Sequence, residues 1–96
     1  MEKIIVLSGG FDPVHVGHMR MFEDAKKYGA KVIVGVNSDK WLIRKKGAPF
    51  MSHEERTEIL KGVKYIDLVV GFNDEDDSAC ELIKDVQSMY PGKDVK

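Results

Sequence analysis

The chain has 96 residues, enough for one domain with a modest core, and its 43% hydrophobic and 32% charged residues are close to globular averages. This composition excludes a disordered, fibrous or membrane class, and a formal charge of −1 gives no basic excess for nucleic acid. A single cysteine, Cys80, suits a reducing compartment. The first apolar run, Ile4–Leu7, is too short for a signal peptide or a membrane span. We therefore expect a cytoplasmic protein that binds neither nucleic acid nor membrane.

The first third of the sequence predicts a strand, a helix and a second strand. The Ile4–Leu7 run is continuous and rich in β-branched residues, as in a strand buried on both faces of a parallel sheet. Apolar residues recur about every three positions over Val16–Tyr28, which predicts a helix that closes at Gly29. Residues 32–36 form the second buried run, and the turn formers 37–39 follow it.

The middle of the chain predicts a basic loop and a helix. Residues 40–51 contain four basic side chains together with Gly47 and Pro49, so this range is expected to be a loop with at most one helical turn. Ser52 and Glu55 have the spacing of a capping box, which predicts a helix that continues through Val63.

The last third predicts a third strand at 66–70 and a third helix. The acidic run 74–77 is expected to be a solvated turn, after which Ser78 caps a helix whose apolar period continues to Met89 and which Pro91-Gly92 ends. Alternating buried strands and helices indicate one α/β domain over residues 1–96, an open doubly wound (Rossmann-like) parallel sheet with flanking helices, truncated after the third helix.

The residues between the first strand and the first helix carry the chemistry. In open α/β sheets, ligands bind beyond the carboxyl ends of the strands. Gly9 and Gly10 allow the backbone to approach a phosphate closely, and His15 and His18 stand at the start of a helix, where free N–H groups attract anions. Gly17 leaves the space between the two imidazoles clear of a side chain. This arrangement predicts a phosphate cradle.

Each of these groups also has a simpler structural interpretation. Two histidines at a helix start often serve only capping or packing, but glycines at this location favour the functional interpretation. A zinc site would need further ligands, and His53 and Cys80 show no supporting spacing, so no metal site is predicted. The basic residues are as well explained by a solvated face as by phosphate binding; they are Lys40, Arg44, Lys45 and Lys46.

The segment 9–18 resembles the signature of the HxGH nucleotidyltransferases, G-x-F-D-x-x-H-x-G-H, and within them the cytidylyltransferase-like group. The signature positions are Gly9, Phe11, Asp12, His15, Gly17 and His18. The resemblance covers about residues 3–71 and includes the segments 36–39, 52–56 and 65–67. Within this group, the sequence is similar to the glycerol-3-phosphate cytidylyltransferases and to the nucleotidyltransferase domains of ADP-heptose synthases.

The resemblance implies transfer of a CMP or AMP group from CTP or ATP to a phosphorylated small molecule, such as glycerol 3-phosphate or a sugar phosphate, with release of pyrophosphate. It implies catalytic roles for His15, His18 and Lys46, Mg²⁺ accompanying the triphosphate, and a homodimer. The nucleotide-binding positions carried over are Gly9, Gly10, Phe11, Asp12, His15, Gly17, His18, Lys45 and Arg56.

Two alternatives stay open. The run from Gly9 to His15 is also similar to nicotinate mononucleotide adenylyltransferases, which form dinucleotides. Related enzymes continue with a strand that ends in a Gly-Gly-Asp-like turn and with a Ser-Thr-Thr segment, and neither occurs before Lys96. We therefore expect an incomplete pocket in this chain, and a non-catalytic fragment that binds nucleotide or only assembles is the second alternative.

Overall fold

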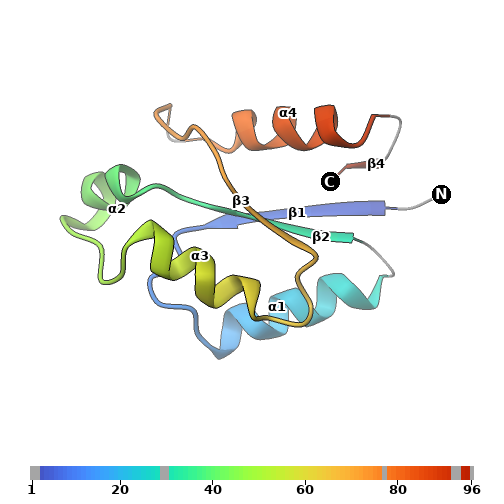
Figure 1. Cartoon of the computed structure of the whole chain (residues 1–96), viewed down its shortest axis with the longest axis horizontal. Coiled ribbons are helices and arrows are strands. Elements are labelled where there is room, and N and C mark those ends of the chain that lie inside the picture. Colours follow the sequence, from blue (N-terminus) through green and yellow to red (C-terminus); the bar gives the residue numbers. More distant parts are fainter. Residues whose placement is uncertain (1–2, 29–30, 77, 92–93, 96) are drawn as a thin grey trace.

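A computed structural model describes residues 3–28, 31–76, 78–91 and 94–95, and its centre is a parallel sheet. Within these residues the strands lie in the order β3-β2-β1-β4, and each neighbouring pair is parallel. Their bounds are β1 (Lys3–Gly9), β2 (Lys31–Val36), β3 (Leu68–Gly71) and β4 (Asp94–Val95). The open parallel sheet predicted from the buried runs is confirmed (Figure 1).

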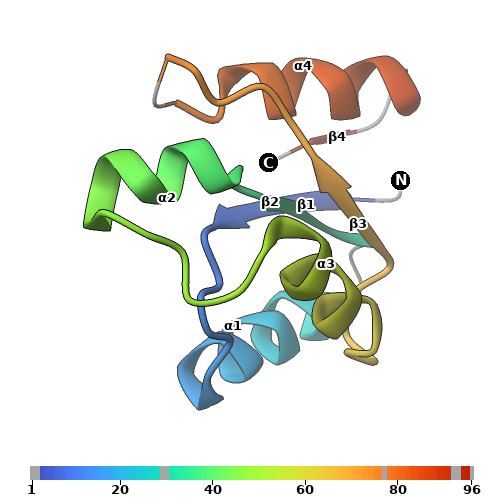
Figure 2. The same ribbon diagram turned by 60° about the vertical axis from the view of Figure 1, so that its left-hand side comes forward.

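Helices cover both faces of this sheet. The helices in the described residues are α1 (Val16–Lys27), α2 (Asp39–Lys46), α3 (His53–Lys61) and α4 (Cys80–Met89). Figures 1 and 2 show α1 and α3 on one face, α4 on the other, and α2 at the edge where β1 and β2 end. Helices on opposite faces make the sheet doubly wound, as the sequence predicts.

Each face of the sheet has its own hydrophobic core, because side chains alternate between the faces of a strand. On the α1 and α3 face the buried residues include Phe22, Val32, Val34, Val36 and Leu60. On the α4 face the buried residues are Ile4, Ile33, Leu82 and Val86. The continuous apolar runs of β1 and β2 are explained by these two cores.

The prediction of a loop over residues 40–51 was wrong for its first half. Residues 39–46 form α2, whose N-cap is Ser38 with its side chain accepting from the Trp41 amide, and whose C-cap is Gly47 at φ 92°. A cap residue at one end and a glycine in the left-handed region at the other delimit a helix of two turns. Its apolar stripe is short because only Leu42 is buried.

Two predicted boundaries of elements also differ from those in the structure. Helix α3 ends at Lys61 with Gly62 as its C-cap, so Val63 lies beyond it. Strand β3 begins at Leu68 rather than at residue 66. Asp67, just before the strand, binds the start of β2 with its side chain as well as its backbone: its amide donates to Val32 O, and its carboxylate accepts from Val32 N at 2.7 Å.

The acidic run was also misjudged at one position. Asp74 is only 3% exposed, so the expectation that it is solvated was wrong. The N-cap of α4 is Ala79 rather than Ser78, although the Ser78 hydroxyl accepts from the Cys80 amide at 3.3 Å. Gly29, Asp77 and Gly92, which entered the predictions above, lie outside the described residues.

The strand register brings three strand ends to one level. Gly9 pairs with Val36, and Val36 pairs with Gly71, so β1, β2 and β3 end together. The turn 9–18, the start of α2 and the segment that follows β3 therefore all begin at one edge of the sheet, where open α/β folds bind their ligands. None of the helices in the described residues is long and apolar enough to cross a membrane.

Candidate active site at the turn between β1 and α1

The turn that follows β1 is shaped from within by Phe11. Its φ of 51° lies in the left-handed region, which is uncommon for a residue with a side chain. The side chain is buried, with 4% exposed. The centre of its ring lies 5.7 Å from the centre of the Phe22 ring and 4.9 Å from the centre of the His18 ring, which it meets edge to face. Burial of this ring opposes the conformational strain, so Phe11 supports His18 from the core.

His15 and His18 cap the helix that they begin. His15 is the N-cap of α1, and its Nδ1 accepts from the Gly17 amide at 3.1 Å. The His18 Nδ1 accepts from the His15 amide at 3.1 Å, which completes a reciprocal capping box. The rings are stacked with their centroids 3.9 Å apart. Capping uses the Nδ1 atom of each ring, so the Nε2 atoms remain for the binding of phosphate that the sequence predicts.

The capping bonds fix the tautomer of both imidazoles. A nitrogen that accepts from an amide carries no proton, so the proton of each neutral ring is on Nε2. Burial, and secondarily the neighbouring His15, lowers the pKa of His18 below its ordinary value, which keeps that ring neutral near pH 7. Each ring consequently presents one Nε2–H donor in addition to its cap.

The His15 ring lies directly beside Gly17. A Cβ at this position would lie 2.9 Å from His15 Cε1 and 3.1 Å from its Nδ1. The first distance is too short for a carbon contact, so a side chain at this position would push the exposed His15 ring aside and weaken its bond to the Gly17 amide. The glycine of the signature thus protects the cap itself.

Asp12 fastens the turn to the segment after α2. Its side chain is only 2% exposed, and the carboxylate accepts from the amides of Phe50 at 2.6 Å and Met51 at 2.7 Å. Burial raises its pKa, but the hydrogen bonds from Lys46 and the two amides outweigh burial and hold the pKa at about 2. The carboxylate is therefore ionised and fully engaged in structure.

The structure separates the two lysines at the end of α2. Lys46 Nζ lies 2.7 Å from Asp12 Oδ2 and donates to Asp12 O at 3.0 Å. Lys45 Nζ lies 5.7 Å from the centre of the Trp41 ring instead. An ammonium group has three donors. Lys46 therefore lies at the turn, and one N–H of its ammonium group remains after these two bonds. The ammonium group of Lys45 lies near Trp41, on its own helix.

Arg56 holds three segments together from the interior. It is fully buried, and its guanidinium donates to Gly10 O at 2.8 Å, to Asn37 O at 2.7 Å and to Met51 O at 3.1 Å. It also pairs with Asp39 at 2.6 Å. These contacts fix the Gly9-Gly10 turn against the ends of β2 and α2, so any influence of Arg56 on a nucleotide passes through the backbone that it holds.

Gly10 completes this contact with α2. A Cβ on Gly10 would come 2.9 Å from Leu42 Cδ2, so the absence of a side chain lets the turn lie directly on α2. Gly9 O accepts from the Asn37 amide at 2.9 Å. Gly10 therefore serves close approach between the first turn and α2, and the Gly9 carbonyl joins the same turn to the junction of β2 and α2.

Sequence reasoning assigned no role to a polar network beside this turn. The Asp74 carboxylate accepts from Asn37 Nδ2 at 3.0 Å, from Ser38 N at 2.8 Å and from Ser38 Oγ at 2.8 Å, and these bonds hold its pKa below the ordinary value although burial raises it. Arg44 donates to Asp74 O at 2.9 Å. The available signal was the polar triplet 37–39 directly after a buried strand.

The acidic side chains near the turn do not form a resident metal site. Asp12 and Asp39 are engaged by Lys46 and Arg56, and no group of three His, Cys, Asp or Glu side chains in the described ranges is arranged to hold a metal ion. These described side chains therefore offer no ready set of protein ligands for Mg²⁺.

Two hollows of the described surface lie outside the 9–18 turn. The larger, of about 530 Å³, is on α3 and is lined by His53, Glu54, Thr57, Glu58 and Lys61. The smaller, of about 190 Å³, lies between α2 and the residues that follow β3. The second is at the strand-end edge of the sheet, beside the Asp74 network.

Comparison with known proteins gives the family of the chain and several relatives. Residues 6–92 match the model of the family described as cytidylyltransferase-like. The bifunctional protein HldE of Sulfurimonas denitrificans is 40% identical over 98% of this chain and 21% of its own length. HldE of Blochmanniella floridana is 40% identical over 93% of this chain and 19% of its length. The chain thus spans about a fifth of the length of these curated relatives.

Solved structures share the fold. The lipopolysaccharide core biosynthesis protein of Thermoplasma volcanium superposes with a TM-score of 0.73 at 16% identity, covering 99% of this chain and 94% of that one. A bifunctional NMN adenylyltransferase/ADP ribose pyrophosphatase of Francisella tularensis gives 0.69 at 24% identity, covering 99% of this chain and 31% of that one. Because the family model spans most of the residues described above, including the whole 9–18 turn, the chain belongs to the cytidylyltransferase-like family.

Proposed function

We propose that this chain is a nucleotidyltransferase domain that transfers a CMP or AMP group from a nucleoside triphosphate to a sugar phosphate or a similar phosphorylated small molecule. The observation that carries the proposal is the histidine capping box, which leaves two Nε2–H donors at the start of a helix after a buried parallel strand. Helix starts attract phosphate through their free amides and dipole. Membership of the family and the similarity to HldE support the same reaction class.

The proposed reaction needs positioned donors and no covalent intermediate on the protein. A phosphate oxygen of the acceptor attacks the α-phosphorus, the bond between that phosphorus and the bridging oxygen breaks, and pyrophosphate leaves with the electron pair. Negative charge develops on the α-phosphoryl oxygens and on pyrophosphate, where fixed donors stabilise it. His15 and His18 donate hydrogen bonds to these oxygens through Nε2–H, and Lys46 donates one through its third ammonium N–H.

The test replaces the imidazoles while preserving the caps. Asparagine is a good N-cap residue and glutamine completes a capping box at the third helical position. His15→Asn and His18→Gln should therefore melt within a few degrees of the wild type. If Nε2 binds phosphate, each substitution should lower turnover by about 10²-fold to 10³-fold, as when one preorganised donor is lost. Calorimetric titration with MgCTP and MgATP should show weaker binding.

Pyrophosphate release distinguishes the acceptors. Each triphosphate is paired in turn with glycerol 3-phosphate, a sugar 1-phosphate and nicotinate mononucleotide, and transfer to the mononucleotide would favour the adenylyltransferase alternative. A wild-type chain that binds neither MgCTP nor MgATP would contradict the proposal. Variants that keep full affinity and turnover would remove the histidines from the mechanism.

A further inference from the structure

We propose that the cap shared by His15 and His18 is a proton-operated switch, in which acid releases the first turn of α1 and weakens the binding of triphosphate. The cap consists of two bonds of 3.1 Å, in which the Gly17 amide donates to His15 Nδ1 and the His15 amide donates to His18 Nδ1. This inference rests on the proposed function and deepens it by adding a control by pH.

Each of these bonds requires an Nδ1 atom that carries no proton. A neutral imidazole with its proton on Nε2 can accept at Nδ1, whereas both nitrogens of an imidazolium are donors. A proton on either ring therefore sets an Nδ1–H group against a backbone N–H group, and that bond is lost. The caps of α2 and α3 are the hydroxyl groups of Ser38 and Ser52, which do not titrate near neutral pH. Among the helices that the structure describes, α1 alone has a side-chain cap that protons can remove near neutral pH.

The charged groups around the two rings do not favour an imidazolium. Arg20 is a further cation on α1 itself. The Asp12 carboxylate, in the turn, is paired with Lys46 of α2, and Arg56 of α3 is paired with Asp39. The rings are stacked with their centroids 3.9 Å apart, and they stand at the positive end of the helix dipole. A charge on one ring is therefore opposed by the dipole and also by a charge on the other ring.

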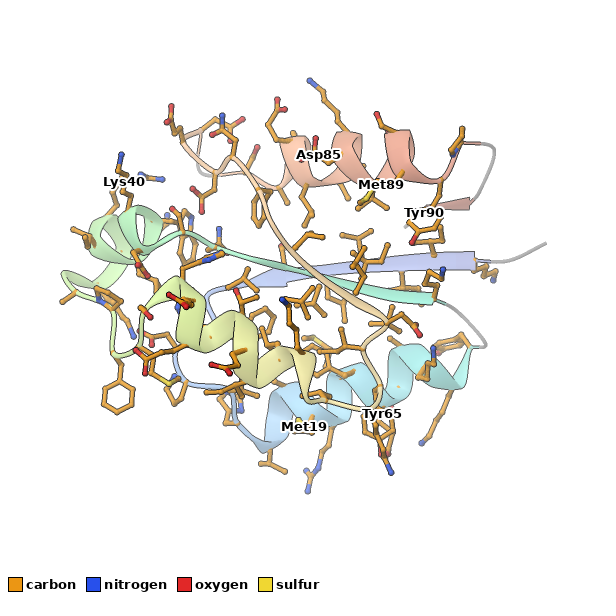
Figure 3. The ribbon with its side chains drawn as sticks, in the orientation of Figure 1. Met19, Lys40, Tyr65, Asp85, Met89 and Tyr90 are labelled. Carbon is orange, nitrogen blue, oxygen red and sulfur yellow. The ribbon has the colours of Figure 1, made fainter. Side chains whose placement is uncertain are left out.

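The remainder of α1 is held independently of the cap, so the release is confined to its first turn. Phe22 is buried in the core. The Tyr65 hydroxyl donates to the Glu23 carboxylate at 2.6 Å, and Figure 3 shows Tyr65 beside α1. Lys26 pairs with Asp67 at 2.6 Å. Protonation should therefore change the start of the helix while the fold persists.

The cap matters to a bound triphosphate because it also fixes the rings. The amide held by each Nδ1 sets the orientation of the ring and hence the position of its Nε2–H donor, and donors fixed in advance stabilise developing charge best. A mobile histidine binds phosphate better when it is protonated, since a charge is added. Here the same proton removes the bond that orients the ring, so the affinity for triphosphate is expected to fall in acid.

A pH titration of the free chain from about pH 8 to about pH 5, followed by nuclear magnetic resonance, tests the release. The Gly17 amide should move upfield with the midpoint of the His15 ring, and the His15 amide should move upfield with the midpoint of the His18 ring. That second midpoint should lie below 6.5, because burial and, secondarily, His15 lower the pKa of His18. The His53 ring, whose Nε2 lies 3.3 Å from Val36 O and which caps no helix, is the control within the chain, and neither amide should follow it. Amides that stay in place while both rings titrate would overturn the switch.

The double variant His15→Asn, His18→Gln supplies a matched control, because its amide side chains accept the same cap bonds and do not titrate. The backbone amides of residues 15 and 17 should then be independent of pH over this range. Continued movement of these amides would assign the pH response to another group and overturn the inference.

Calorimetric titration with MgCTP at the two ends of this range separates the inference from the proposed function. The affinity of the wild type should fall in acid about fivefold more than that of the double variant, which corrects for protonation of the nucleotide; this factor corresponds to one lost cap of typical strength. An affinity that rises in acid would show that the imidazolium is the binding form, and it would overturn the inference while the function stands. A wild-type chain that binds MgCTP at neither pH, with both amides following the rings, would contradict the function and support the release of the helix.

Discussion

At the scale of single residues, the two histidines combine structure and chemistry in different atoms. Each Nδ1 accepts a helix-start amide and each Nε2 is left as a donor. The residue types and their spacing were evident in the sequence, and so was their place at a helix start. The reciprocal cap was not, because histidine is uncommon among capping residues and the bond depends on ring rotamers that a spacing does not specify.

The same geometry predicts an unusual response to Gly17→Ala. Alanine favours the helix by up to about 1 kcal/mol, but the displaced His15 ring loses a cap that contributes about 0.5–2 kcal/mol, so the free energy of unfolding should change little. Affinity for MgCTP should nevertheless fall, because the ring moves. Gly62→Ala is the control, since its Cβ would meet only Ile59 O at 3.4 Å. Equal MgCTP affinity in both variants would contradict the role given to Gly17.

Asp12 predicts a pH dependence with a definite sign. Its pKa of about 2 in the folded chain lies below the ordinary value of 3.8, so folding favours the ionised form. The stabilisation is complete above about pH 4 and is lost as the pH falls toward 2. The difference in free energy of unfolding between the wild type and Asp12→Asn should therefore shrink over this range in denaturant titrations. A difference independent of pH would show that folding does not lower the pKa of the Asp12 carboxyl.

At the scale of elements, the short helix α2 was the main surprise. Its sequence is basic and only one of its residues is buried, so periodicity gave little signal. Ser38 before it and Gly47 after it were readable as cap residues and could have delimited it. The helix is held less by its own apolar face than by polar contacts with Asp74 and Arg56, which join it to segments remote in sequence. Such contacts cannot be inferred from local pattern.

Asp74 is therefore expected to contribute more to stability than the exposed acidic residues that follow it. Asp74→Ala leaves buried donors of Asn37 and Ser38 without an acceptor, and it should lower the free energy of unfolding by about 2–4 kcal/mol. Glu75→Ala, in the same acidic run but exposed, should change the denaturation midpoint little. Similar midpoints for the two variants would contradict the buried network.

At the scale of the whole molecule, the buried runs predicted the sheet and its helix-covered faces correctly. Uninterrupted apolar strands need cover on both sides, which leaves few arrangements other than a doubly wound sheet. The candidate site was predictable to the extent that it is local: the turn 9–18 lies where the fold places ligands. The contributions of Asn37, Asp39 and Asp74 depend on strand order and register, which bring separate strand ends to one level.

The central claim is that the 9–18 turn binds triphosphate through the Nε2–H groups of His15 and His18. Nitrogen-15 spectra of the imidazole rings test it most directly, recorded near pH 7 with and without MgCTP or MgATP. We predict unprotonated Nδ1 and protonated Nε2 in both rings of the free chain, and a shift of the Nε2 signals on addition of triphosphate. Protonated Nδ1 in the free chain, or Nε2 signals that do not move with either triphosphate, would contradict the account.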